Sequence, residues 1–82
     1  MANARTMNVY VEYTSGENIG RIIGAVREND VHVYDIEITK GDPKNGIAPS
    51  VVFSVRLPKK YSHSAFLSEL SKAEGVTAVE EL

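Results

Sequence analysis

The chain has 82 residues, 43% of them hydrophobic and 24% charged, which is typical of one small soluble globular domain and excludes a disordered chain. A net charge of -2, with lysines and arginines scattered along the chain, argues against a nucleic-acid-binding surface, because such a surface needs a basic stripe. The chain has no cysteine, so disulfides, thiol catalysis and cysteine-bound metals are excluded. We find neither an apolar run of membrane-spanning length nor a hydrophobic signal region at the N-terminus.

The first part of the chain predicts a strand followed by a helix. Residues 7–13, MNVYVEY, place an apolar side chain at every second position, which is the period of a half-buried strand. After the turn TSGEN, apolar residues recur at the spacing of one helical face over about residues 18–28, and Ser15 or Asn18 can cap this helix. Residues 1–6, which precede the strand, are expected to be a linker or disordered.

The next strand lies in NDVHVYDIEITKG, residues 29–41, and its apolar phase slips by one residue at Tyr34-Asp35. A β-bulge there would supply one extra residue and place Val33 and Ile36 on the same face. The alternative is a regular strand that exposes one apolar pair on the open face of the sheet. Both outcomes bear on function, since bulges and exposed apolar faces are common where domains pair or hold ligands.

The rest of the chain predicts a hairpin, a second helix and a last strand. Residues 50–57, SVVFSVRL, alternate as a strand, and residues 41–49, rich in glycine, proline and asparagine, form the exposed connection that precedes it. The second helix is opened by Ser62 or Ser64 and ended by Gly75 as its C′ residue. The closing VTAVEEL is a short strand. One domain over residues 7–82 follows, with an α+β, ferredoxin-like βαββαβ sandwich whose four-stranded antiparallel sheet carries two helices on one face.

Two segments resemble a known family. The sequence NIGRIIGAVRENDVHVYDIEI, a helix that leads through a polar turn into a Val-His-Val-Tyr-Asp-Ile strand, resembles the ACT domain, in which a helix leads into a Val-Asn-Ile-x-Asp-Ile strand. The C-terminal LSELSKAEGVTAVEEL is similar to that family's second helix and its Gly-Val-x-x-Val last strand. The resemblance covers most of the chain from Met7 onward and implies a regulatory or interaction domain without catalysis.

A narrower resemblance concerns VHVYDIEITKG, VVFSVRLPKKYSHSAFLSEL and GVTAVEEL, which are similar to the cytoplasmic C-terminal ACT-like domain of the MgtC/SapB family of membrane proteins. That family is linked to magnesium homeostasis, and a hydrophobic membrane region precedes the domain in it. The resemblance implies a soluble cytoplasmic tail of an inner- or plasma-membrane protein, whose partner is the membrane region of the same full-length protein. The alternative is a free-standing ACT-type sensor that binds an amino acid or similar small effector at a dimer interface.

The loop after the first strand departs from the ACT pattern. ACT domains that bind amino acids carry Asp-x-x-Gly there, and the matching positions here are Thr14 and Glu17. Glu17 has a side chain and a charge where the motif has bare backbone, although the neighbouring Gly16 could shift the register. An effector in this loop would meet Thr14, Gly16, Glu17, Asn18 and Gly20. The MgtC-type tail accommodates the departure better than an amino-acid sensor does.

No residue pattern indicates catalysis, a cofactor or a metal site. His32, Asp35 and Glu37 would need a bulge to come together, and the spacing of Asp30, Asp35 and Glu37 does not indicate a magnesium site. His63 is expected at the surface. The turn TSGENIG has a glutamate where an acylphosphatase-type enzyme of this fold needs a phosphate-binding arginine. RNA binding would require aromatic residues on the open face of the third strand, and none is present.

A self-association surface is expected on the open face of the sheet, at Tyr10, Tyr34, Ile38 and Val52, or at whichever of these the bulge leaves outside. A domain of this size gains stability by pairing. The resemblance adds that ACT-like domains pair through strand edges and helices. We therefore expect a homodimer and no nucleic-acid partner.

Overall fold

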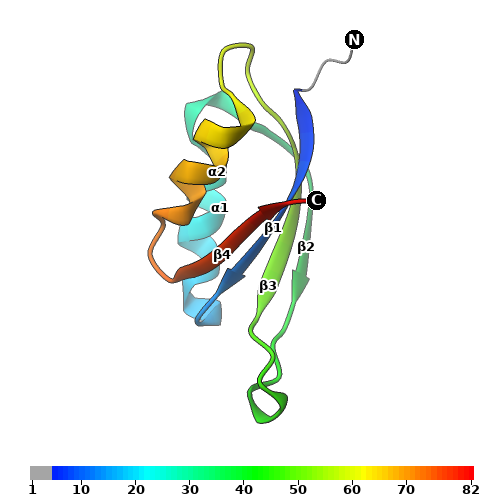
Figure 1. Cartoon of the computed structure of the whole chain (residues 1–82), viewed down its shortest axis with the longest axis vertical. Helices are drawn as coiled ribbons and strands as arrows, with labels where there is room; N and C mark the ends of the chain where they lie inside the picture. The colour runs from blue at the N-terminus through cyan, green and yellow to red at the C-terminus, as the bar shows by residue number, and fades with distance from the viewer. Residues whose placement is uncertain (1–4) are drawn as a thin grey trace.

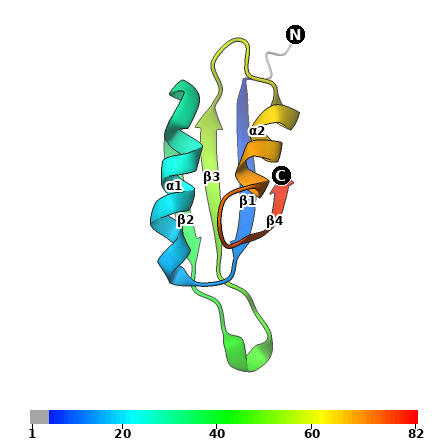
Figure 2. The same ribbon diagram turned by 90° about the vertical axis from the view of Figure 1, so that its left-hand side faces the viewer.

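The computed structural model describes residues 5–82 as one antiparallel sheet with two helices packed on one of its faces (Figures 1 and 2). The sheet contains β1 (Thr6–Tyr13), β2 (His32–Thr39), β3 (Ser50–Arg56) and β4 (Val76–Glu81), which lie side by side in the order β2-β3-β1-β4. The α-helices are α1 (Ile19–Arg27) and α2 (His63–Ser71). The chain also contains three short 3-10 helices, which are η1 (Gly16–Asn18), η2 (Glu28–Asp30) and η3 (Pro43–Asn45). This βαββαβ architecture confirms the predicted ferredoxin-like fold.

The N-terminal segment was expected to be a linker over residues 1–6. Residues 1–4 lie outside the described part of the chain, and β1 begins at Thr6. Within residues 5–82, no helix combines the length and the apolar character that a membrane crossing requires.

The hydrophobic core lies between the sheet and the two helices. β1 and β3 occupy the centre of the sheet because each has a partner on both sides, and every second side chain of both strands points into the core. Each side chain that is fully removed from water contributes roughly 1.5–3 kcal/mol to stability. The core side chains that are 0% exposed are Val9, Val11, Ile22, Val26, Val51, Phe53 and Leu70.

The second helix begins as the sequence predicts and ends earlier. The Ser62 hydroxyl accepts a hydrogen bond from the Ala65 N–H at 3.1 Å, which caps the N-terminus of α2. The helix ends at Ser71, with Lys72 as its C-cap, so the prediction that Gly75 is the C′ residue is wrong. The chain first makes a further turn, closed by the Ala73 N–H bonding to the Leu70 carbonyl. Gly75 instead adopts a φ of 87° in the turn that leads into β4.

The phase slip in β2 is a β-bulge. Val33 pairs with Val55 and Asp35 pairs with Ser54, so Tyr34 is the extra residue between two regular stretches. Val33 and Ile36 consequently both pack against the core. The structure confirms the bulge and excludes the regular strand that was the alternative.

A protruding arm, residues 40–49, extends the β2–β3 hairpin beyond the sheet (Figure 1). Its two limbs cross at Gly41, where a Cβ atom would overlap the backbone of residues 47–49. Beyond this crossing, Asp42 and Ile47 exchange backbone hydrogen bonds of 2.8 and 3.0 Å. Gly46 closes the turn with a φ of 69°, so the arm has internal hydrogen bonds of its own.

Candidate functional site

A hollow of about 430 Å³ lies where the turn between β1 and α1 meets the base of the arm. Its walls come from segments far apart in the sequence, namely the end of β1 and the β1–α1 turn, the first residue of α1, the end of β2 and the two limbs of the arm. Ile19, Ile38, Pro43 and Pro49 make these walls largely apolar, and Lys40 is the charged residue of the lining. This combination suits a small ligand with an apolar body.

The turn that forms one wall is held by its own polar side chains. The Ser15 hydroxyl accepts a hydrogen bond from the Glu17 N–H at 3.2 Å. The Asn18 side-chain oxygen accepts from the Ser15 N–H at 3.1 Å and from the Thr14 hydroxyl at 3.0 Å. The Thr14 N–H donates to the Gly75 carbonyl at 2.9 Å. The turn is therefore tied to the segment that enters β4 and does not depend on a ligand for its shape.

The structure separates the five residues predicted to meet an effector. Thr14 and Gly16 line the hollow, whereas Glu17, Asn18 and Gly20 are not among its lining residues. The Asn18 amide oxygen is already engaged by Thr14 and Ser15, which gives this side chain a structural role. A Cβ atom built on Gly16 would meet no atom within 4 Å, so this position has free space in front of it.

Sequence reasoning missed the residues that the end of β2 and the start of the arm contribute to the hollow. Ile38 lies opposite Val51 on the helix-covered face of the sheet, yet 55% of it is exposed. Lys40 follows at the start of the arm. The antiparallel pairing of β2 with β3 brings these residues beside Thr14. The spacing of residues in the sequence does not predict this proximity.

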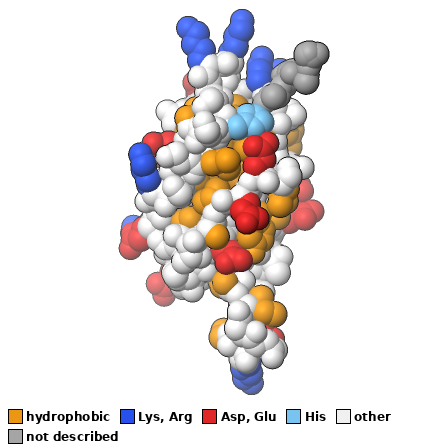
Figure 3. Space-filling model, in the orientation of Figure 1, with side chains coloured by type: hydrophobic (Ala, Val, Ile, Leu, Met, Phe, Trp, Pro, Cys, Tyr) orange, Lys and Arg blue, Asp and Glu red, His pale blue; other side chains and the backbone are white. Residues whose placement is uncertain are grey.

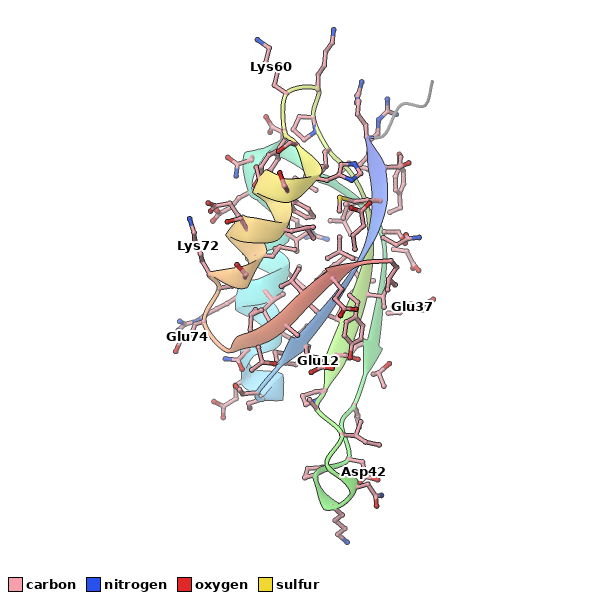
Figure 4. All side chains as sticks on the ribbon, in the orientation of Figure 1. Glu12, Glu37, Asp42, Lys60, Lys72 and Glu74 are labelled. Carbon is pink, nitrogen blue, oxygen red and sulfur yellow. The ribbon has the colours of Figure 1, made fainter. Side chains whose placement is uncertain are left out.

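The open face of the sheet carries a small apolar centre with carboxylates around it. Tyr10 and Val52 are direct neighbours on β1 and β3, and both are half-buried. Glu37 lies beside Val52 on β2, and Glu80 lies beside Tyr10 on β4. Figure 4 shows the side chains of Glu12 and Glu37 on the sheet, away from the helices. Self-association through this face would bring like charges together.

The Tyr10 hydroxyl donates a hydrogen bond of 2.5 Å to Glu12 Oε2. This hydrogen bond is the largest of several effects that raise the pKa of Tyr10 above its ordinary value, with burial and the negative charges of Glu12 and Glu80 adding to it against a smaller opposing effect of Ser50. Burial alone raises the pKa of Tyr13, on the opposite face of the same strand. Both phenols therefore stay neutral to a higher pH than an exposed tyrosine does.

The four residues predicted for self-association do not form one surface. Tyr10 and Val52 lie together at the centre of the open face. Tyr34, 55% exposed at the bulge, packs edge-on against the His32 ring at a centroid distance of 4.7 Å. Ile38 belongs to the hollow on the other face of the sheet.

The histidines have structural neighbours. The bulge places His32 and Asp35 on the same open face, but within residues 5–82 no group of three or more side chains is arranged to hold a metal ion. His63, expected at the surface, is only half-buried. Its Nδ1 lies 3.0 Å from Glu81 Oε2, which links the start of α2 to the end of β4.

Comparison with solved structures identifies the architecture. The ACT domain from GTP pyrophosphokinase of Chlorobium tepidum superposes with a TM-score of 0.72 at 14% sequence identity, over 94% of this chain and 96% of that one. This chain has the ACT fold. The C-terminal domain of the MgtC protein from Mycobacterium tuberculosis matches with a TM-score of 0.66 at 15% identity, over 100% of this chain and 92% of that chain.

The same fold also occurs as part of a longer enzyme chain. A formyltetrahydrofolate deformylase from Pseudomonas putida KT2440 matches with a TM-score of 0.69 at 20% identity, over 94% of this chain but only 28% of that chain. No protein-family model matches the sequence, and no curated protein matches it either. At these identities the comparisons establish the fold, in agreement with the resemblance noted in the sequence.

Proposed function

We propose that the chain is a non-catalytic regulatory domain that forms the cytoplasmic tail of a membrane protein of the MgtC/SapB type. The observation that carries the proposal is the match to the C-terminal domain of an MgtC protein, which extends over 100% of this chain and 92% of that chain. The match therefore extends over nearly the whole length of both domains. The sequence resemblance in β2, β3 and the C-terminal strand supports the same assignment.

The domain would act through its conformation. β1 is the strand that a preceding membrane region would join, and it is a central strand paired with both β3 and β4. A partner or effector that favours one packing of the sheet would therefore bias the attached region through this strand.

The proposal includes a homodimer. Sedimentation that shows only a 9.0 kDa species at high micromolar concentration would contradict the dimer.

Fractionation of source cells tests the membrane assignment. An antibody raised against this domain is expected to detect a band in the membrane pellet that resists a carbonate wash and dissolves in detergent. A band confined to the soluble fraction would contradict the proposal. The link to magnesium homeostasis is tested separately, since cells that lack the domain are expected to grow more slowly than their parent only when magnesium is scarce.

The hollow supports a second candidate function, which is the binding of a small effector by a free-standing sensor. The specific observation is an apolar cavity of about 430 Å³ with Thr14 and Gly16 in its wall. In a thermal-shift panel of amino acids, nucleotides and divalent ions, a ligand at a hundredfold its dissociation constant adds about 2.7 kcal/mol of stability.

A matched pair of variants locates any such binding. Gly16→Val fills space in the hollow and is expected to abolish the ligand-induced shift. Gly20→Val adds the same side chain where the space is equally free, but Gly20 lies outside the lining, so this variant should leave the shift unchanged. Equal shifts in both variants would place the ligand elsewhere.

A further inference from the structure

Four cationic side chains gather at the end of the molecule where the described chain begins. Leu57 and Arg5 are joined by a backbone hydrogen bond of 2.7 Å, and Arg5 Nε donates to the Leu57 carbonyl at 3.4 Å. Arg56 is the last residue of β3, and Lys59 and Lys60 follow it after Leu57 and Pro58. We call this end, formed by Arg5, Arg56, Lys59 and Lys60, the basic end.

The two lysines are held outward by a closed turn. The Tyr61 N–H donates to the Pro58 carbonyl at 3.0 Å, which makes Lys59 and Lys60 the two central residues of a β-turn. The Tyr61 ring packs edge-on against the buried Phe66 with a centroid distance of 5.8 Å, and this contact anchors the turn to the core. Both lysines are exposed, and within residues 5–82 neither forms an ion pair. Figure 4 shows Lys60 projecting beyond the ribbon at this end.

The charge of the molecule is distributed unevenly along its long axis, which measures 44 Å. Figure 3 shows lysine and arginine side chains projecting at the basic end, while aspartates and glutamates border the apolar stripe below. Glu28 and Asp30, in the α1–β2 connection, offset part of this positive charge. Because the whole chain carries a net charge of -2, the remainder of the molecule is acidic, and the basic end is the part that an anionic surface would attract.

We propose that the basic end docks on the surface of a membrane that contains anionic lipids. The inference rests on the proposed function, because a membrane region joined before β1 would hold this end of the domain at the lipid surface. Lys and Arg side chains near such a surface are attracted by its negative potential within about one Debye length, roughly 8 Å at physiological salt. Docking would direct the arm and the hollow away from the membrane, toward the cytoplasm (Figure 1).

Vesicle co-sedimentation of the 82-residue chain at low salt tests the docking directly. We expect the chain to pellet with vesicles of phosphatidylcholine mixed with phosphatidylglycerol and to remain in solution with vesicles of phosphatidylcholine alone. Lys59→Glu/Lys60→Glu should weaken the partition by about tenfold or more. Lys40→Glu/Lys44→Glu changes the net charge by the same amount at the arm, and its partition should stay within about twofold of the parent. Circular dichroism verifies that both variants fold.

Several outcomes would overturn the inference. No preference for anionic vesicles at low salt, or an equal loss in the two double variants, would mean that the basic end does not dock. Tighter binding of an RNA or DNA oligomer at the same salt would assign the cations to nucleic acid instead. The vesicle assay uses the domain without any membrane region, so it tests the docking alone. If the chain does not bind vesicles but cell fractionation shows a membrane-anchored band, only the docking is rejected. A soluble band in cells rejects the proposed function on separate grounds.

Discussion

Asn18 shows how one side chain can shape the candidate site without lining it. Its amide oxygen accepts hydrogen bonds from Thr14 and Ser15, and its side chain lies directly against Gly75 in the turn before β4. The sequence analysis predicts Asn18 as one of the loop residues that an effector would meet. The contact with Gly75 was not predictable, because Gly75 is distant in sequence and only the fold brings the two residues together.

Gly75→Ala is expected to destabilise the domain. The substitution adds a Cβ atom at a φ of 87°, where that atom would overlap the Asn18 amide, so we expect a loss of about 1–3 kcal/mol in the free energy of unfolding. Urea denaturation measures the change. Gly16→Ala is the control, because this glycine has free space and no positive φ, and its effect should stay within about 0.5 kcal/mol. A loss of equal size in both variants would contradict this account of Gly75.

Tyr10 provides a test by pH titration. Its raised pKa is caused first by the hydrogen bond to Glu12, so Glu12→Gln is expected to lower the pKa at which this phenol ionises. Phenolate absorbance follows the titration, and Tyr10→Phe identifies its contribution. Tyr13 is the internal reference because its pKa is raised by burial alone. An unchanged titration in the Gln variant would show that Glu12 is not the cause.

The sign of the linked stability follows from the raised pKa. The folded state favours the neutral phenol, so the stabilising contribution of Tyr10 is fully present below the pKa of an unfolded tyrosine, about 10. It is lost as the pH rises through the higher pKa of the folded state. The hydrogen bond between Tyr10 and Glu12 therefore contributes to the stability of the sheet throughout the physiological pH range.

At the scale of elements, the bulge in β2 accounts for the apolar phase of that strand. Tyr34 is the extra residue, and the stretches before and after it each alternate regularly. Deletion of Tyr34 would join them into one regular strand with Val33 and Ile36 still on the core face. We expect the deletion variant to fold, with near-native circular dichroism and cooperative urea unfolding.

The matched control is deletion of Ser54, which lies opposite Asp35 in the central strand β3. No bulge is available there, so the deletion would turn Phe53 or Val55 toward solvent, and we expect the variant not to fold. Loss of structure in the Tyr34 deletion to the same degree would contradict the assignment of Tyr34 as the inserted residue.

The elements were largely predictable from local patterns, and their contacts were not. Alternation and helical spacing predicted the strands, the helices and the bulge, because these features depend on neighbouring residues. The end of α2 was misplaced because Gly75 was interpreted as the C′ residue of the helix, whereas the chain makes a separate turn before β4. The contributions of Ile38 and Lys40 to the hollow were missed, since they follow from the pairing of β2 with β3.

At the scale of the whole molecule, the two ends differ in chemistry. One end carries the hollow and the arm, and the other carries Arg5, Arg56, Lys59 and Lys60. In the sequence these cations looked scattered apart from the lysine pair, because the contact between Arg5 and Leu57 forms only in the folded chain. The elongated shape separates the two ends (Figures 1 and 2), so a membrane at the basic end would leave the hollow open to effectors or partners.

The intact mass of the endogenous polypeptide tests the central claim most directly. The protein would be captured from detergent-solubilised source cells with an antibody against this domain and measured by mass spectrometry, with peptide mapping of whatever precedes β1. The account predicts a polypeptide well above 9.0 kDa that contains apolar, membrane-spanning peptides before the domain. A polypeptide of 9.0 kDa with no preceding peptides would contradict the claim and leave the free-standing sensor as the better explanation of the fold.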